Sequence, residues 1–230
     1  MTGLRATNKE RNRRQILLAA ATIVEERGLA AMTMREIARC AQLSVPTIYN
    51  LIGGTNDVVL AMVTSQNDRY GAQFENSTAN PEDRAVAAVT GLADTMLEHR
   101  TVTREIIGHS QTMLRAAGGP GIFSKATEVL TGCFRQAENE GLIRAHLDPA
   151  ILARRTMGMI IASAHSWANN DSSDAALRVE AEHAVLLIIA AVSMPAGRDR
   201  IDARLREVEL RLTNLTGAPD QTVRTSNASP

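Results

Sequence analysis

The side chains that most often carry catalysis or bind metals are few in this chain and are scattered along it. A zinc site needs several ligands at short, regular spacings, and no such pairing occurs among the histidines His99, His109, His146, His165 and His183. No nucleophile, base and orienting group can be assembled. The glycine-rich run at 118–121 follows no strand and precedes no Lys-Ser/Thr pair, as a phosphate-binding loop would. The sequence therefore predicts no enzyme, no metal and no cofactor.

Positive charge gathers at the N-terminal end, which indicates a partner of negative charge. Residues 1–55 contain eight Lys or Arg and four Glu, a net charge of +4, although the whole chain is neutral. The basic members are Arg5, Lys9, Arg11, Arg13, Arg14, Arg27, Arg35 and Arg39. No Lys or Arg occurs between Arg39 and Arg69. Attraction to an anion must therefore come mainly from the N-terminal end.

Composition places the chain among globular proteins with an aliphatic interior. Apolar residues make up 44% of 230 residues, whereas aromatic residues make up only 3%. The longest purely apolar run, 184–192, is far too short to cross a bilayer. The charged start of the chain leads into no signal-type apolar segment. We expect a cytoplasmic protein with no membrane association, whose two distant cysteines are reduced.

Apolar residues recur with helical spacing almost throughout, and no convincing alternation typical of a strand appears. The sequence predicts an all-α chain in three parts: a three-helix domain at 1–55 with a basic arm at 1–14, a larger helical domain at 56–215, and a disordered tail at 216–230. Helices are expected at 9–27, 33–41, 44–52, 55–73, 81–99, 102–116, 122–140, 149–169, 175–194 and 198–214.

Two short helices near the N-terminus have clear start signals. In "TMRE", Thr33 should cap one helix while the Glu36 side chain reaches back to complete a capping box. Ser44 should cap the next helix, with Pro46 tolerated in its first turn. Gly53-Gly54 should end that helix, and Thr55 should cap the one after it. Two short helices joined by a tight turn form a helix-turn-helix, although an ordinary helical hairpin has the same pattern.

Residues 10–60 resemble the DNA-binding domain of the TetR family of bacterial transcriptional regulators, the tetracycline-repressor-like proteins. The stretch "TMREIARCAQLSVPTIYNLIGGTNDVVLAMV" carries the resemblance, above all at Thr33, Ile37-Ala38, Leu43-Ser44 and 47–49. "GLIRAHLDPAILA" also resembles the family's lead-in to its dimerisation helices. The resemblance implies a homodimer that binds a palindromic double-stranded DNA operator, responds to a small effector and most often acts as a repressor. It makes 1–55 the helix-turn-helix DNA-binding domain and 56–215 the helical effector-binding and dimerisation domain.

The resemblance also assigns roles to individual residues. Arg35 would reach a base edge or a phosphate, and the hydroxyls of Thr33 and Thr47 would contact phosphates. Tyr49 would place its phenol on the DNA backbone, although it could instead be a core residue. Pro46 can lie against a thymine methyl group, and Asn50 has the amide geometry for adenine. The full set of expected DNA contacts is Arg11, Arg14, Thr33, Arg35, Ser44, Val45, Pro46, Thr47, Tyr49, Asn50 and Thr55.

Three departures from the family pattern bear on DNA binding. Gln42 stands where the family usually has a turn glycine, which implies backbone strain. Ile52 replaces a usual aromatic residue, and Thr55 replaces a lysine that contacts phosphate. Asp57 suits the start of a helix but would repel phosphate. A small-molecule-binding or protein-interaction module whose DNA-binding helix has decayed is therefore the alternative function.

The later helices offer candidates for an effector pocket and a dimer interface. Flexible aliphatic side chains favour an elongated apolar effector, with Gln66, His109 and Trp167 as possible polar anchors. The expected pocket residues are Met62, Gln66, Met96, His109, Met113, Phe123, Met157 and Trp167. The runs at 157–164 and 184–192 are apolar nearly all round, so Ile161 and Leu187 are expected in an interface between two copies. The alternative is that both runs are simply core.

Overall fold

Helices account for nearly all of the chain in the computed structural model, which describes residues 2–74, 79–116 and 123–216. No strand occurs in these ranges, and a single antiparallel bridge joins Ile143 to Ser193. The all-α prediction is confirmed. None of the helices within the described ranges is long and apolar enough to span a membrane.

The N-terminal elements are α1 (Thr2–Arg27), the short 3₁₀ helix η1 (Leu29–Ala31), α2 (Met34–Ala41), α3 (Val45–Leu51) and α4 (Thr55–Ala72). The following helices are α5 (Pro81–Glu98), α6 (Arg100–Ala116), α7 (Ser124–Asn139), α8 (Pro149–Ala168), α9 (Asp174–Val192) and α10 (Pro195–Thr216). The main difference from the expected ranges is that α1 begins at Thr2, so the basic arm is the first part of this helix. The predicted tail from 217 onward lies outside the described residues.

Polar caps explain where several of these helices begin. The side chain of Asn80 accepts a hydrogen bond from the Asp83 amide at 2.8 Å, and Asp148 accepts one from the Ala150 amide at 2.8 Å. Each cap is followed by a proline at the first helical position, where no amide proton is needed. The helix start predicted from Asp148-Pro149 is therefore confirmed.

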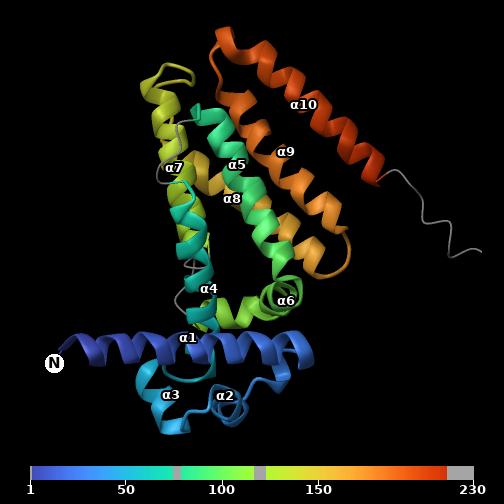
Figure 1. Cartoon of the computed structure of the whole chain (residues 1–230). Coiled ribbons are helices and arrows are strands. Elements are labelled where there is room, and N and C mark those ends of the chain that lie inside the picture. Colours follow the sequence, from blue (N-terminus) through green and yellow to red (C-terminus); the bar gives the residue numbers. More distant parts are fainter. Residues whose placement is uncertain (1, 75–78, 117–122, 217–230) are drawn as a thin grey trace, which may run out of the picture.

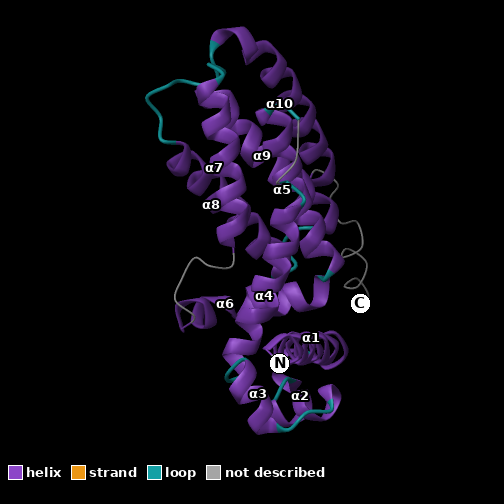
Figure 2. Cartoon of the chain, turned by 60° about the vertical axis from the view of Figure 1, so that its left-hand side comes forward, coloured by secondary structure: helices purple, strands orange, loops and turns teal. Residues whose placement is uncertain are grey.

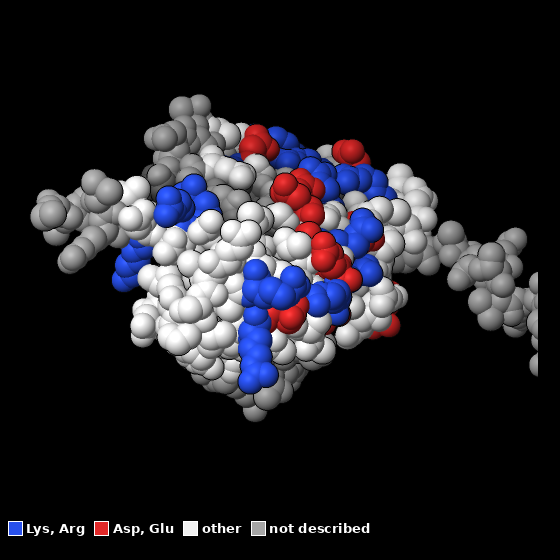
Figure 3. Space-filling model, turned by 60° about the horizontal axis from the view of Figure 1, so that its bottom comes forward, with Lys and Arg blue, Asp and Glu red and all other residues white. Residues whose placement is uncertain are grey.

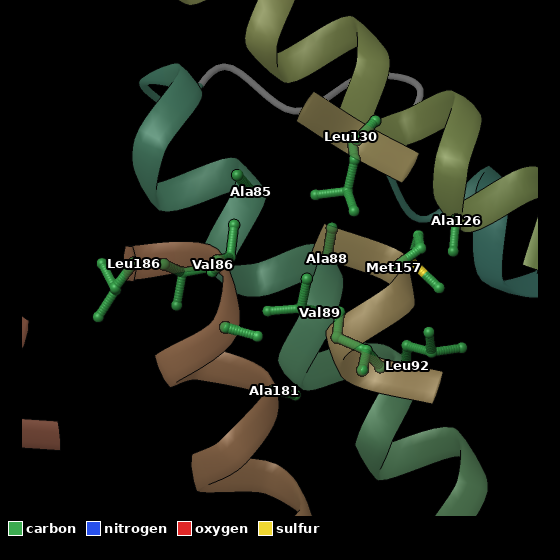
Figure 4. Packing of buried hydrophobic residues seen from close by; sticks show 14 of the residues in the cluster. Ala85, Val86, Ala88, Val89, Leu92, Ala126, Leu130, Met157, Ala181 and Leu186 are labelled. Atoms are coloured by element: carbon green, nitrogen blue, oxygen red, sulfur yellow. The ribbon is translucent and has the colours of Figure 1, made fainter. Parts of the chain in front are cut away.

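The larger of two hydrophobic cores is built around α5. Figure 4 shows side chains of α5, among them Val86 and Leu92, packed between Leu130 of α7, Met157 of α8 and Leu186 of α9. α10 packs against α9 on the side away from the N-terminal helices (Figure 1). Burying a side chain of this size is worth about 1.5–3 kcal/mol relative to exposure. This core therefore holds α5, α7, α8 and α9 together as one body.

The smaller core joins α1, α2 and α3 to parts of α4 and α6. Its buried members include Ile23 of α1, Ile37 of α2, Ile48 of α3 and Val58 of α4. Val102 and Ile106 of α6 also belong to it, whereas Ile107 belongs to the larger core. Figures 1 and 2 show α1 crossing beneath α4 and α6, with α2 and α3 on its far side. α2 and α3 are thus presented at one end of the molecule.

Candidate nucleic-acid interface

The turn between α2 and α3 depends on one residue with an unusual backbone conformation. Gln42 has φ 52° and ψ 40°, in the left-handed region. This conformation brings the Leu43 amide within 3.0 Å of the Ala38 carbonyl oxygen, which closes the turn. A non-glycine residue there costs roughly 1–2 kcal/mol. The strain expected from a glutamine in the glycine position is present.

Hydroxyl groups cap both helices of the motif, as predicted. The Thr33 hydroxyl accepts a hydrogen bond from the Glu36 amide at 3.3 Å, and the Ser44 hydroxyl accepts one from the Thr47 amide at 3.2 Å. The Ser44 and Thr47 hydroxyls are 2.7 Å apart. These caps fix the start of α3, where Pro46 has no amide proton and the Thr47 amide is already bonded to Ser44.

The predicted capping box is wrong in its second half. The Glu36 carboxylate does not reach back to the Thr33 amide but binds Arg27 at 2.8 Å and Arg39 at 3.0 Å. Hydrogen bonds from Arg39 and Arg27 lower the pKa of Glu36 to about 2, and the same contact raises the pKa of Arg39. Two guanidinium groups therefore share one carboxylate, and together the three side chains contribute +1. Charge–charge attraction between nearby side chains outweighed the local capping pattern.

α3 presents a face of uncharged side chains. Ile48 is fully buried and anchors the helix in the smaller core, while Pro46, Tyr49 and Asn50 are exposed. Tyr49 is 54% exposed, so the alternative that it is a core residue is wrong. Val45 and Thr47 are half-buried at the start of the helix. The arrangement offers apolar and amide groups to a partner, but no cation.

Cations lie to the side of this face. Arg35, the second residue of α2, is exposed and has no ion-pair partner among the described residues. Arg11 and Arg14 of α1 are also exposed, but Arg14 lies on the face of α1 that meets α4 and α6. Figure 3 shows Lys and Arg gathered with Asp and Glu on one side of this end of the molecule, next to a broad uncharged surface.

The start of α4 differs from the prediction. Thr55 is the first helical residue and not the cap; Gly54 precedes the helix, and its amide donates to the Asp57 carboxylate at 2.8 Å. Gly53 has φ +122°, and a side chain there would stand 2.3 Å from the same carboxylate. Asp57 is thus a structural residue of the α3–α4 turn. Its place three residues after Gly54 was the sequence signal for this role.

The structure separates the expected effector residues. Met96 and Met157 are buried in the larger core with Phe123 packed against it, whereas Met62 is buried in the smaller core. The side chains of Gln66, His109 and Met113 lie outside the described residues. Trp167 is fully buried and its indole N–H already donates to Asp174 at 2.7 Å. The described residues contain no cluster of potential metal ligands.

The expected dimer residues Ile161 and Leu187 are both half-buried. The exposed residues of α8 include Ile151, Arg155, Gly158 and Ala162, at spacings of four, three and four. This spacing places them on one side of the helix. A β-carbon added at Gly158 would meet no atom within 4 Å, so this side of α8 is open within one copy.

Comparisons with known proteins agree with this arrangement. Residues 16–62 match the family model described as bacterial regulatory proteins, tetR family. A comparison with curated proteins found no match. Similar solved structures include SmeT, the repressor of the Stenotrophomonas maltophilia multidrug efflux pump SmeDEF, at 22% identity and a TM-score of 0.58, covering 80% of this chain and 91% of SmeT.

Two further structures have the same fold. The transcriptional regulator FadR from Bacillus subtilis, crystallised with stearoyl-CoA, has 16% identity and a TM-score of 0.61, covering 76% of this chain and 97% of FadR. The tetR regulator TylP from Streptomyces fradiae has 19% identity and a TM-score of 0.60, covering 88% and 98% of the two chains. Residues 16–62 therefore match the tetR family of bacterial regulatory proteins, and the chain shares the fold of these solved structures.

Proposed function

We propose that the protein is a homodimeric repressor that binds a palindromic DNA operator through α3 and leaves it when a small apolar effector binds. The observation that carries this proposal is the outward face of α3. Pro46, Tyr49 and Asn50 are exposed on a short helix that Ile48 holds firmly in the core. Exposed side chains on a well-anchored helix are what base reading requires.

An uncharged helix face can recognise some of the base edges that the major groove exposes. Thymine presents a methyl group and adenine presents a donor–acceptor pair, so Pro46 and Asn50 can read them without a cation. Thr47 and Tyr49 have hydroxyls for phosphate oxygens. Attraction to the duplex comes from Arg35 and the basic start of α1.

A palindromic operator requires a two-fold symmetric protein. The open side of α8, with Ile151 exposed to 44% and Gly158 free of neighbours, is our candidate for the surface between two copies. Ile161 and Leu187, each half-exposed on α8 and α9, would extend it. A dimer built on this surface would present two α3 helices to successive turns of the major groove.

The effector would bind in the larger helical region. FadR, a structural neighbour, was crystallised with a fatty acyl ligand, and SmeT is a repressor. In this chain Met96 and Met157 give the larger core flexible, polarisable side chains that can repack around an apolar guest. A protein with these properties would act in the cytoplasm, where the chromosome lies.

Selection from random duplexes tests the proposal directly. The full chain should enrich sequences with two-fold symmetric half-sites about one helical turn apart, and a duplex from the region upstream of its own gene should compete for it. Binding to non-symmetric sites would refute the dimeric operator model. Absence of any enrichment, with the fold intact by circular dichroism, would favour the alternative of a binding module without DNA recognition.

A further inference from the structure

A cleft of about 720 Å³ lies where α1 passes α4 and α6. Figures 1 and 2 both show these three helices meeting at the junction between the N-terminal helices and the larger helical body. This volume falls within the range of roughly 300–1,000 Å³ that small-molecule sites occupy. The cleft is separate from the larger core in which Met96 and Met157 lie.

One wall of the cleft is apolar, including a leucine that the fold itself leaves uncovered. Leu17 and Leu18 of α1 face Met62 of α4 and Val102 of α6 across it. Leu18 is 69% exposed, the highest value among the large apolar side chains exposed in the described chain. Single exposed leucines are ordinary on protein surfaces, but this one borders a cleft that also has an apolar lining from the residues named above, beside the polar Thr64, Ser65 and His99. A bound aliphatic chain would cover it.

The rim of the cleft is positively charged. Arg13 and Arg14 both line it, and neither has an ion-pair partner among the residues described. Glu10 also lines the cleft, so the charged groups there sum to +1. Guanidinium groups bind carboxylates through paired hydrogen bonds, and low-dielectric walls strengthen such contacts. The cleft thus combines an apolar wall with a cationic edge.

We propose that this cleft binds a small amphipathic anion, a medium-chain aliphatic carboxylate, with its chain against Leu18 and Met62 and its head on Arg13 and Arg14. Such a ligand occupies the Arg14 side chain, which lies on the side of α1 away from α2 and α3, so the ligand acts on DNA binding through the position of α1. It also bridges α1, α4 and α6, and so fixes the N-terminal helices relative to the rest of the molecule. The effect on DNA rests on the proposed function, whereas ligand binding itself does not.

Calorimetry with octanoate on the full chain measures binding without DNA. Octanoate should bind, and octanol and octyltrimethylammonium should bind at least about tenfold more weakly, because the head must pair with guanidinium groups. R14Q should lower the affinity for octanoate about tenfold. L18S should lower this affinity severalfold and leave the fold intact, because Leu18 is largely exposed. R135Q, at an exposed arginine of α7 with no ion-pair partner in the described chain, is the matched control and should bind as the wild type does.

The location of the ligand is read from methyl resonances of ¹³C-labelled methionines. Octanoate should shift the Met62 methyl and leave those of Met96 and Met157 in place. Equal binding of the cationic probe, unchanged affinity in both R14Q and L18S, or shifts confined to Met96 and Met157 would each overturn the proposed site.

The effect on DNA binding is measured separately. Octanoate should weaken binding of the wild-type protein to a duplex, and this effect should disappear in R14Q. If octanoate shifts Met62 yet leaves DNA affinity unchanged, the site stands and the effect on DNA binding is refuted. If no duplex binds at all, the proposed function fails while the calorimetric result is unaffected.

Discussion

Removing the negative charge of Glu36 should strengthen DNA binding, because this carboxylate occupies two guanidinium groups. It lies 2.8 Å from Arg27 and 3.0 Å from Arg39, and each of these arginines is at least 41% exposed. In E36Q both are released. Each new phosphate contact should steepen the slope of log K against log salt by about 0.9. At about 0.15 M salt this corresponds to roughly fivefold tighter binding per contact, for operator and random DNA alike.

Fluorescence anisotropy titrations at four or five salt concentrations measure the slope. The matched control is E26Q, which removes the same charge from an exposed position of α1 where the described residues include no ion-pair partner. E26Q releases no arginine, so its slope should equal that of the wild type, with only a small screened gain in affinity. If E36Q and E26Q show the same slope, Arg27 and Arg39 do not reach phosphates and the reasoning is refuted.

Four further predictions follow from the same domain and from the candidate interface. N50A should weaken operator binding by about 1–3 kcal/mol and leave random-DNA affinity and the salt slope unchanged in the same titrations; an equal loss on random DNA would contradict base reading. Q42N should raise the free energy of unfolding in urea by up to about 1 kcal/mol, because asparagine tolerates the left-handed conformation better than glutamine; no gain would mean that the turn is unstrained. L187E should convert a dimer to monomers or aggregates in sedimentation, since an unpaired charge in an interface is costly; an unaffected dimer would place the interface elsewhere. Because the pKa of Glu36 is lowered to about 2, its ion pairs stabilise the fold above pH 4.5 and are lost as the pH falls toward 2; the urea stability of the wild type should therefore decline more steeply in that window than that of E36Q, and parallel curves would contradict it.

The sequence predicted correctly those features of the fold that depend on contacts between residues close together in the chain. Thr33, Ser44 and Asp148 cap helices by contacts within three residues, and such contacts can be read directly from spacing. The left-handed turn residue was also predictable, since a tight turn between two helices requires one whichever residue type fills it. Exposed side chains on α3 follow from the burial of Ile48, because helical periodicity then fixes the opposite face.

Predictions failed where a distant residue competed with a local pattern. Glu36 satisfies the capping-box spacing, yet Arg27 lies nine positions earlier and only the packing of α1 against α2 brings it within reach. Met62 shares its residue type with Met96 and Met157, but α4 runs through both cores and its first half belongs to the smaller one. Composition can identify flexible apolar residues, whereas only the arrangement of helices decides which of them meet.

α6 contributes side chains to both hydrophobic cores, so it can couple the N-terminal helices to the larger helical body. Val102 and Ile106 are buried against α1 and α4, whereas Ile107 packs in the larger core. On the opposite side, Arg104 lies 4.6 Å from the centre of the Trp167 ring and hydrogen-bonds to Asn170 at 2.7 Å.

A displacement of α6 that loosens its hold on α1 must therefore also disturb the contact between Arg104 and Trp167. Close-packed cores do not deform continuously, so such a helix tends to have discrete positions. Trp167 is the single tryptophan of the chain, and its emission reports this contact without an added label. A ligand that binds in either half can change the affinity of the other only to the extent that it favours one position of α6 over another.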